Sequence, residues 1–338
     1  MRPLLYFQDL GGTNFFLPIL GKLPKKFTKN CMLSFDKQSS FLENSIDTSF
    51  YRNFSLITDN FSTSNWKNLL IDNKTTHIIC TLSSQLLNSS NHNLIDSANE
   101  LNLPIMGIFD HWKGFDRLFD KKKNKAFNLS KVLVIDNEVK EKLILNGMHS
   151  NSISIIGHPQ LESIKNMPRK ASNTKKDVLL VSQPDNINKS FRSIFDLDFF
   201  QNRTLAEILL DICNKNDLSL KIRPHPKEIF NNDDYLSESR DFSSKEEVFL
   251  SEKIIIGLNS MFLLESYLAG NITIKLDLKE FHAYDVDKIP YKFGLNASTI
   301  AELEELILDP PNIKSTLTNK LFDGSSDRLI SNIYNFLS

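Results

Sequence analysis

Short apolar runs alternate with amphipathic stretches along the whole chain. Continuous apolar runs that end in polar or small residues are typical of parallel strands buried on both faces. We expect such strands at residues 3–8, 31–35, 54–58, 77–82, 103–109, 131–136, 152–156, 177–184, 218–226, 253–260 and 272–276. Helical periodicity occupies residues 15–23, 93–101, 138–146, 203–214, 261–270, 301–308 and 329–337. This alternation predicts an α/β protein made of two Rossmann-like domains that face a central cleft.

The length of 338 residues suits two α/β domains better than one. Residues 166–176 are polar and show no period, as is common in linkers between domains. We therefore expect an N-terminal domain at 1–165 and a C-terminal domain at 177–338. An alternative for the last helix is that it packs back on the N-terminal domain.

The charge of the chain is balanced, with 40 Lys and Arg against 41 Asp and Glu. Nucleic-acid binders usually carry a strong basic excess, so we expect no nucleic-acid partner. Cys31, Cys80 and Cys213 lie too far apart in sequence for a disulfide framework or a metal motif, which indicates reduced thiols. We recognise no secretory signal and no membrane-spanning run, so we expect a cytoplasmic protein.

Lysine and arginine also cluster in a few short runs, at 121–125, 169–170 and 175–176. Solvated loops are the ordinary explanation for such runs. The alternative is a weak peripheral contact with the anionic face of the inner membrane.

One stretch in the second half carries the clearest functional pattern. A strand ends in Arg223-Pro224-His225-Pro226, and another ends in Gly257-Leu258-Asn259-Ser260 directly before a helix. The carboxyl ends of parallel strands meet at one edge of a sheet, where ligands collect. Asn259 or Ser260 would cap the helix, whose N-terminal amides attract anions. The pattern predicts a phosphate site in which Arg223 and His225 add charge.

A glycine turn follows the first expected strand, in Asp9-Leu10-Gly11-Gly12-Thr13-Asn14. Glycine lets the backbone approach a ligand closely, and Thr13 or Asn14 would cap the next helix. The turn is not a Walker loop, because no Lys-Ser or Lys-Thr pair follows, and it lacks the G-x-G-x-x-G spacing. It is either a ligand-binding turn or a tight turn with a packing role.

A third cluster, Asp110-His111-Trp112, stands at the carboxyl end of the strand at 103–109. Polar side chains at this position in an α/β sheet are candidates for catalysis. The alternatives are a helix-capping role for Asp110 and a place in the core for Trp112.

These motifs resemble those of GT-B glycosyltransferases, in particular bacterial sialyltransferases and related capsule-building transferases. The segment Arg223–Pro226 is similar to their His-Pro motif, and Gly257–Met261 with Glu265 is similar to their serine-bearing phosphate loop. The glycine turn stands where many such enzymes admit acceptor or donor. The resemblance implies an acceptor-side N-terminal domain and a C-terminal domain that binds the nucleotide sugar.

By this resemblance, His225 would hydrogen-bond the donor phosphate or its leaving oxygen, and Ser260 with the helix amides would bind the phosphate. Glu265 would reach the ribose hydroxyls or remain an exposed helix carboxylate, and Arg223 would add charge or pair with a carboxylate. The implied donor-binding set is Arg223, His225, Pro226, Asn259, Ser260, Met261, Glu265, Ser182 and Gln183. The implied acceptor or phosphate side is Gly11, Gly12, Thr13, Asn14 and Trp112.

The catalytic base is not fixed by a motif, because the acidic motif of several sialyltransferase families is not plainly present. On chemical grounds, a base must lie within about 3 Å of the acceptor hydroxyl. We rank Asp110 first, Asp9 second and His111 third, and we interpret His158 as structural. GT-B enzymes need no metal, so we expect no metal and no cofactor besides the nucleotide sugar as co-substrate.

The implied function is an inverting, metal-independent glycosyltransferase of bacterial surface glycan synthesis. Its donor would be a CMP-activated acidic sugar, such as a sialic-acid-like nonulosonate or Kdo, and its acceptor a glycan or a lipid-linked glycan. The alternatives are a UDP-sugar transferase or 2-epimerase on the same fold, a hydrolase, a CDP-polyol phosphotransferase-like enzyme, and a non-catalytic glycan-binding relative.

Overall fold

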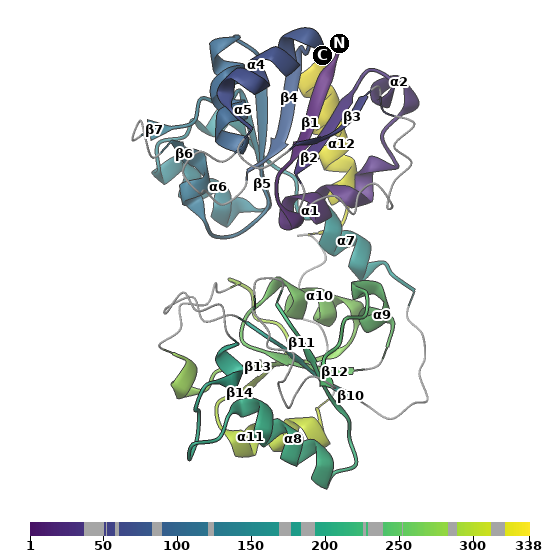
Figure 1. The fold of residues 1–338 in the computed structure, drawn as a ribbon, viewed down its shortest axis with the longest axis vertical. Helices are drawn as coiled ribbons and strands as arrows, with labels where there is room; N and C mark the ends of the chain where they lie inside the picture. Colours follow the sequence, from purple (N-terminus) through teal and green to yellow (C-terminus); the bar gives the residue numbers. More distant parts are fainter. Residues whose placement is uncertain are drawn as a thin grey trace. The chain divides into compact units, whose positions relative to one another are not determined.

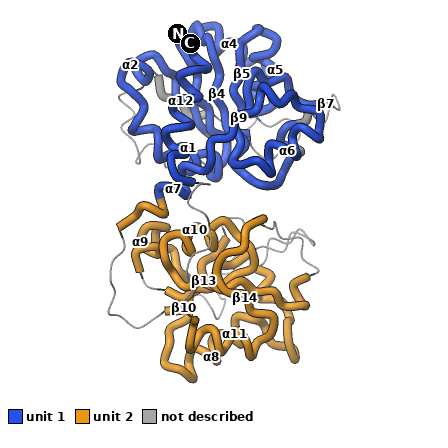
Figure 2. The backbone as a smooth tube through the Cα atoms, turned by 180° about the vertical axis from the view of Figure 1, so that it is seen from behind, with its two compact units in different colours: residues 1–163, 319–338 blue, residues 164–318 orange. Residues whose placement is uncertain are grey.

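The computed structural model describes residues 1–36, 51, 53–57, 61–82, 90–120, 125–168, 177–183, 193–225, 228, 239–251, 253–282, 289–311 and 322–338. The chain divides into two compact units, drawn in separate colours in Figure 2. Unit 1 consists of Met1–Ser163 with Asn319–Ser338, and unit 2 of Ile164–Thr318. The last residues of the expected second domain, 177–338, therefore belong to unit 1, from Asn319 onward. Residues 169–176 of the expected linker lie outside the described residues.

Unit 1 is built on a seven-stranded parallel sheet in the order β3-β2-β1-β4-β5-β8-β9. This is the strand order of the dinucleotide-binding Rossmann fold with one further strand at the edge. Every residue of β1 and β5 is buried, which explains why these strands read as continuous apolar runs. The strands are Pro3–Phe7 (β1), Met32–Asp36 (β2), Asn53–Ile57 (β3), His77–Thr81 (β4), Ile105–Phe109 (β5), Lys131–Val134 (β8) and Ile153–Ile155 (β9).

Several helices of unit 1 begin just after a side chain that accepts a hydrogen bond from a first-turn amide, as those after Asp9, Ser62 and Asp136 do. α4 packs against α5, and α1 packs against α12 (Figure 1). The helices are Leu10–Leu20 (α1), Lys25–Thr28 (α2), Thr63–Asp72 (α4), Ser90–Glu100 (α5), Asn137–Leu145 (α6), Pro159–Lys165 (α7) and Ser325–Leu337 (α12). Short 3₁₀ turns stand at Phe115–Leu118 and Ser150–Ser152, and Phe119–Asp120 (β6) pairs with Lys125–Ala126 (β7).

Unit 2 is built on a five-stranded parallel sheet in the order β11-β10-β12-β13-β14. Its strands are Asp177–Val181 (β10), Leu220–Arg223 (β11), Lys253–Gly257 (β12), Ile272–Leu276 (β13) and Leu295–Ala297 (β14). Figure 1 shows α9 (Lys245–Leu250) and α10 (Met261–Ala269) on one side of this sheet and α8 (Leu205–Lys215) and α11 (Ile300–Leu308) on the other. The core on the α8 side includes Leu180, Ile256 and Leu209. Short 3₁₀ turns stand at Ile194–Asp196 and Lys279–Phe281.

Helices α1 and α9 are among those that differ from the sequence-based expectation. The first helix begins at Leu10, not near residue 15, because Asp9 caps it and Gly11 and Gly12 lie inside its first turn. α9 lies in a segment for which the sequence pattern predicted no helix. Its start carries a Ser-x-x-Glu capping box, Ser244 with Glu247, which is the signal that predicts it.

One carboxylate accepts several hydrogen bonds at the start of the last helix. Glu162 of α7 accepts hydrogen bonds from the backbone N–H of Gly324 and from both the N–H and the hydroxyl of Ser326, at the start of α12. Burial by itself raises the pKa of Glu162, but the hydrogen bonds from Ser326 and Gly324 outweigh it and lower the pKa. A carboxylate at this position also complements the positive end of the helix dipole.

We expect Glu162→Gln to lower the free energy of unfolding by about 1 kcal/mol at neutral pH, as the loss of a helix cap does. Because the folded-state pKa is lowered, this contribution is present above the ordinary value of 4.5 and disappears as the pH falls below it. Denaturant unfolding at pH 7 and pH 3.5 measures both effects. The matched control is Glu138→Gln, which removes an exposed ion pair with Lys142 and should change stability little. An equal loss in Glu162→Gln at both pH values would contradict the assignment.

Candidate functional site

The carboxyl edge of the unit 1 sheet is organised around the switch point between β1 and β4, where the strand order reverses. Asp9 follows β1, and its side chain accepts a hydrogen bond of 2.8 Å from Gly12 N. The cap of α1 is thus Asp9, and the prediction that Thr13 or Asn14 caps it is wrong. Thr13 is fully buried and donates its hydroxyl to the backbone oxygen of Asp9 at 2.7 Å, while Asn14 is half-buried.

The two glycines of α1 have different surroundings. A Cβ at Gly12 would lie 2.5 Å from the side chain of Thr81, so only glycine lets α1 approach β4 this closely. A Cβ at Gly11 would lie 3.4 Å from Asp110 Oδ2 and 3.6 Å from Asp9 Oδ1, at ordinary contact distance. The packing role therefore accounts for Gly12, while Gly11 lies between two carboxylates.

Asp110 is a buried acid of this edge. It is 8% exposed, and Arg117 donates to its Oδ1 at 3.0 Å. Burial raises the pKa of the Asp110 carboxyl, and the Arg117 guanidinium opposes the shift without cancelling it. The helix-cap alternative for Asp110 is wrong, since its described partner is Arg117. A carboxyl with a raised pKa can give and take a proton nearer to neutral pH than an ordinary one.

The two residues after Asp110 have other environments. The indole of Trp112 is 1% exposed and donates to Asp136 Oδ2 at 2.5 Å, so this side chain belongs to the core of unit 1. His158 is buried as well. The centre of its ring lies 4.7 Å from that of Phe15 and 6.2 Å from that of Trp112, as expected for a structural residue. His111 is half-buried, and its Nδ1 accepts from Lys113 N at 3.1 Å.

We expect Gly12→Ala and Gly11→Ala to have opposite effects on stability. The added methyl at Gly12 should cost about 1–3 kcal/mol, because it overlaps with Thr81. The methyl at Gly11 should stabilise α1 by up to about 1 kcal/mol, because alanine has the higher helix propensity. Urea unfolding of the two variants measures both changes. Similar losses in the two variants would contradict the proposed packing role.

In unit 2 the strand order reverses between β10 and β12, and their carboxyl ends carry Ser182-Gln183 and Asn259-Ser260. Asn259 N donates to Gln183 Oε1 at 3.3 Å, which joins the two strand ends directly. The sheet thus brings together four of the predicted donor-binding residues. Met261 opens α10 and is half-buried, and Pro226 lies outside the described residues.

Glu228 links this edge to the predicted His-Pro segment. It is 8% exposed, and it accepts from Ser182 Oγ at 2.5 Å and from His225 N at 2.9 Å. Ser182 Oγ also lies 2.7 Å from Ser193 Oγ. Burial raises the pKa of Glu228, and the hydrogen bonds from Ser182 and His225 oppose the shift. Sequence reasoning did not single out Glu228, although a carboxylate three residues after His225 is the spacing of a capping box.

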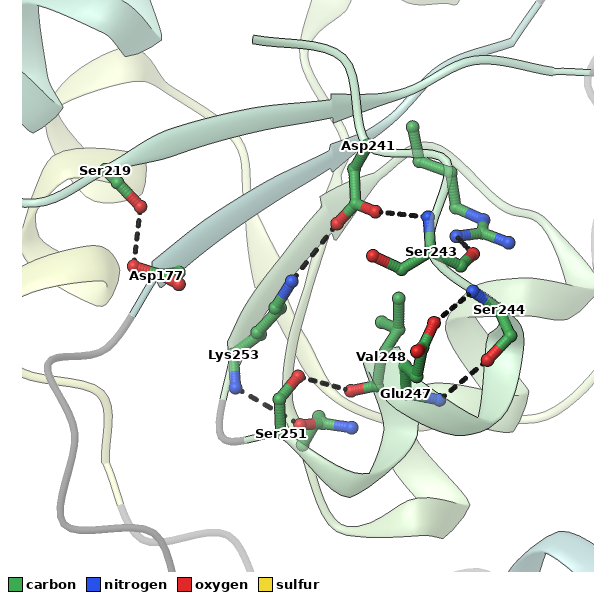
Figure 3. A network of polar contacts seen from close by, with 11 residues as sticks. Asp177, Ser219, Asp241, Ser243, Ser244, Glu247, Val248, Ser251 and Lys253 are labelled. Atoms are coloured by element: carbon green, nitrogen blue, oxygen red, sulfur yellow. Dashed lines mark hydrogen bonds and ion pairs between the residues drawn. The ribbon is translucent and has the colours of Figure 1, made fainter.

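Arg223 reaches the first turn of α10. Its guanidinium lies 4.8 Å from the ring centre of Phe262 and donates to the backbone oxygen of Ser243 at 2.8 Å. Figure 3 shows how Asp241 holds this loop, by accepting from Ser243 N at 2.8 Å and from Lys253 at 3.1 Å. Burial lowers the pKa of Arg223, although nearby carboxylates raise it, and an arginine remains charged under these conditions.

Glu265 is not the exposed helix carboxylate that one interpretation of the sequence predicted. It is 1% exposed, and Lys245 donates to both of its oxygens, at 2.7 and 3.0 Å. Lys245 also lies 5.9 Å from the ring centre of Phe262. The first turn of α10 therefore packs against two cations, of which the sequence indicated only Arg223.

Ser260 occupies the capping position of α10, but its side chain makes no capping hydrogen bond. Its Oγ is shielded from solvent, and no described residue hydrogen-bonds it. Of the two predicted caps, Ser260 does stand at the capping position of α10. Asn259 does not, and its side chain accepts instead from Ile289 N at 3.4 Å. A buried hydroxyl without a partner costs about 1–3 kcal/mol, so it marks a place where a partner would be stabilising.

Comparison with known proteins gives matches in structure alone. No family model and no curated protein sequence matches the chain. The UDP complex of MnaA from S. aureus superposes with a TM-score of 0.67 at 14% identity and covers 100% of this chain and 97% of that one. UDP-GlcNAc 2-epimerase from Methanocaldococcus jannaschii gives 0.64 at 12% identity, covering 99% and 100%. The Neisseria meningitidis 2-epimerase bound to UDP-GlcNAc gives 0.59 at 12%, covering 100% and 99%.

The fold is GT-B-like. Two Rossmann-like units, each on a parallel sheet, confirm the predicted fold class. Identities of this size show the fold and nothing finer. No sequence comparison supports the sialyltransferase-like part of the resemblance. Among the described residues, no helix is both long and apolar enough to cross a membrane.

Proposed function

We propose that this protein is an enzyme that binds a UDP-activated sugar in unit 2 and epimerises it at C2, in the synthesis of bacterial surface glycans. The observation that carries the proposal is the start of α10. There the hydroxyl of Ser260 has no partner among the described residues, and the Arg223 cation lies on Phe262. Backbone amides at a helix start, a hydroxyl and a fixed cation form a site for a diphosphate.

The choice of nucleotide rests on the structural comparisons. Of the similar structures, one holds UDP and another holds UDP-GlcNAc. This supports the UDP-sugar alternative over the CMP-sugar transferase that the His-Pro motif suggested. Ser182 and Gln183 stand at the same switch point and are proposed to contact the nucleoside, and His225 to contact the phosphate.

The choice of reaction rests on Asp110. Epimerisation at C2 of a UDP-sugar requires a group that removes the C2 proton while the C1–O bond to UDP breaks and a C1–C2 double bond forms. A second group returns a proton to the opposite face of C2 while UDP adds back at C1. A carboxyl whose pKa is raised by burial and moderated by Arg117 suits this exchange. Asp9 and His111 remain the second and third candidates for the other proton transfer. Glu265 is proposed to hold Lys245 beside α10, because its own carboxylate is buried in that ion pair.

Nucleotide binding is tested by a thermal-shift panel of UDP, CMP, CDP and GDP. We expect UDP to raise the melting temperature, since a ligand at 100 times its Kd adds about 2.7 kcal/mol to stability. His225→Ala should reduce the shift by about half, as about tenfold weaker binding does, while His149→Ala, at an exposed histidine of unit 1, should leave it unchanged. A shift with CMP alone would favour the CMP-sugar transferase. No shift with any nucleotide would refute a nucleotide site.

The reaction is tested by incubation with UDP-GlcNAc in D₂O without acceptor, followed by NMR. We expect the C2 epimer to appear with deuterium at C2, because the proton is exchanged during the reaction. Asp110→Asn should slow the reaction by at least about 100-fold, as loss of an acid–base group does, while Asp72→Asn on the surface of α4 should not. Release of free UDP and sugar would indicate a hydrolase. Binding without any turnover would indicate a transferase or a binding protein.

A further inference from the structure

Glu228 and His225 are joined by two hydrogen bonds, one to the Glu228 side chain and one between backbone groups. His225 N donates to Glu228 Oε2 at 2.9 Å, and Glu228 N donates to His225 O at 2.9 Å. The bond from His225 N to the Glu228 carboxylate is the one that the glutamate makes in a capping box, and the second bond closes the turn between the two residues. The main chain of His225 is therefore held at both its N–H and its carbonyl by one residue.

The other carboxylate oxygen of Glu228 is fixed to the neighbouring strand. Ser182 Oγ donates to Oε1 at 2.5 Å, and Ser193 Oγ lies 2.7 Å from Ser182 Oγ. Ser182 and Glu228 are 2% and 8% exposed, so water does not compete for these bonds. Glu228 thus spans from the end of β10, at the switch point, to the exit of β11 that carries the imidazole.

The burial of this carboxylate needs an explanation beyond stability. Burying a charged group is unfavourable, and apolar residues in such places are often at least as stabilising. A side chain that reaches two strand ends at once does, however, fix their relative position to the accuracy that a binding site requires. We propose that Glu228 is a positioning residue, which acts through His225 to set the imidazole for the nucleotide phosphate. This inference rests on the proposed function of unit 2.

The experiment measures UDP affinity by calorimetry for two substitutions at Glu228. One removes the charge of the side chain and keeps its length, and the other keeps the charge and shortens the side chain. Glu228→Gln keeps the length of the side chain, accepts from His225 N and donates to Ser182, so we expect affinity within about twofold of the wild type. Glu228→Asp keeps the charge but is one methylene shorter and cannot span both partners, so we expect about tenfold weaker binding. Glu207→Asp, the matched control, shortens the carboxylate of the capping box at the start of α8, on the side of the sheet opposite α10, and should leave the affinity unchanged.

A double-substitution cycle separates positioning from a general effect on the fold. In a His225→Ala background, which should itself bind UDP about tenfold more weakly, Glu228→Asp should cause no further loss, because its effect passes through the imidazole. If Glu228→Asp weakens UDP binding just as much in that background, the inference is overturned. It is also overturned if Glu228→Asp binds UDP with wild-type affinity, or if Glu228→Gln binds UDP as weakly as Glu228→Asp. If the wild type binds UDP and only these comparisons fail, the proposed function stands. If the wild type binds no UDP, both proposals fall.

Discussion

Parallel pairing of the strands is the constraint on which the rest of this structure depends. In each unit every strand of the main sheet runs the same way, so all carboxyl ends lie along one edge. In unit 2 the chain leaves β10 for α8 on one face of the sheet and leaves β12 for α10 on the other. The two connections diverge between β10 and β12, and this divergence leaves the end of the sheet open to a ligand.

Burial on both faces of a sheet also determines where its polar groups can be. The strands themselves are apolar, and the polar residues gather just beyond their ends, where Ser182, Glu228 and Ser260 stand. Most of these groups satisfy one another, since Glu228 binds Ser182 and the backbone of His225. Ser260 Oγ differs, because no described residue supplies its hydrogen bond. A bound anion at this place would accept the hydrogen bond that the Ser260 hydroxyl does not make to any described residue.

The two units supply different chemistry at their sheet edges. Unit 1 holds a buried acid, Asp110, whose protonation is balanced between burial and Arg117. Unit 2 presents a helix start with two cations, Arg223 and Lys245, packed on Phe262. The proposed function rests on these two features, a buried carboxyl with a raised pKa in unit 1 and a cationic helix start in unit 2.

The sequence by itself determined all but the last strand of the two main sheets, with their polar ends, and hence the fold class, because a buried parallel strand needs an apolar run whatever it packs against. It also placed Arg223 and Ser260 at strand ends. Only the tertiary structure decided which side chains meet. Ser182 bonds Glu228 across 46 positions, Lys245 neutralises Glu265 across 20, and Trp112 enters the core. Local patterns specify local conformation, whereas the pairing of distant polar groups follows from how complete elements pack, which no short window of sequence contains.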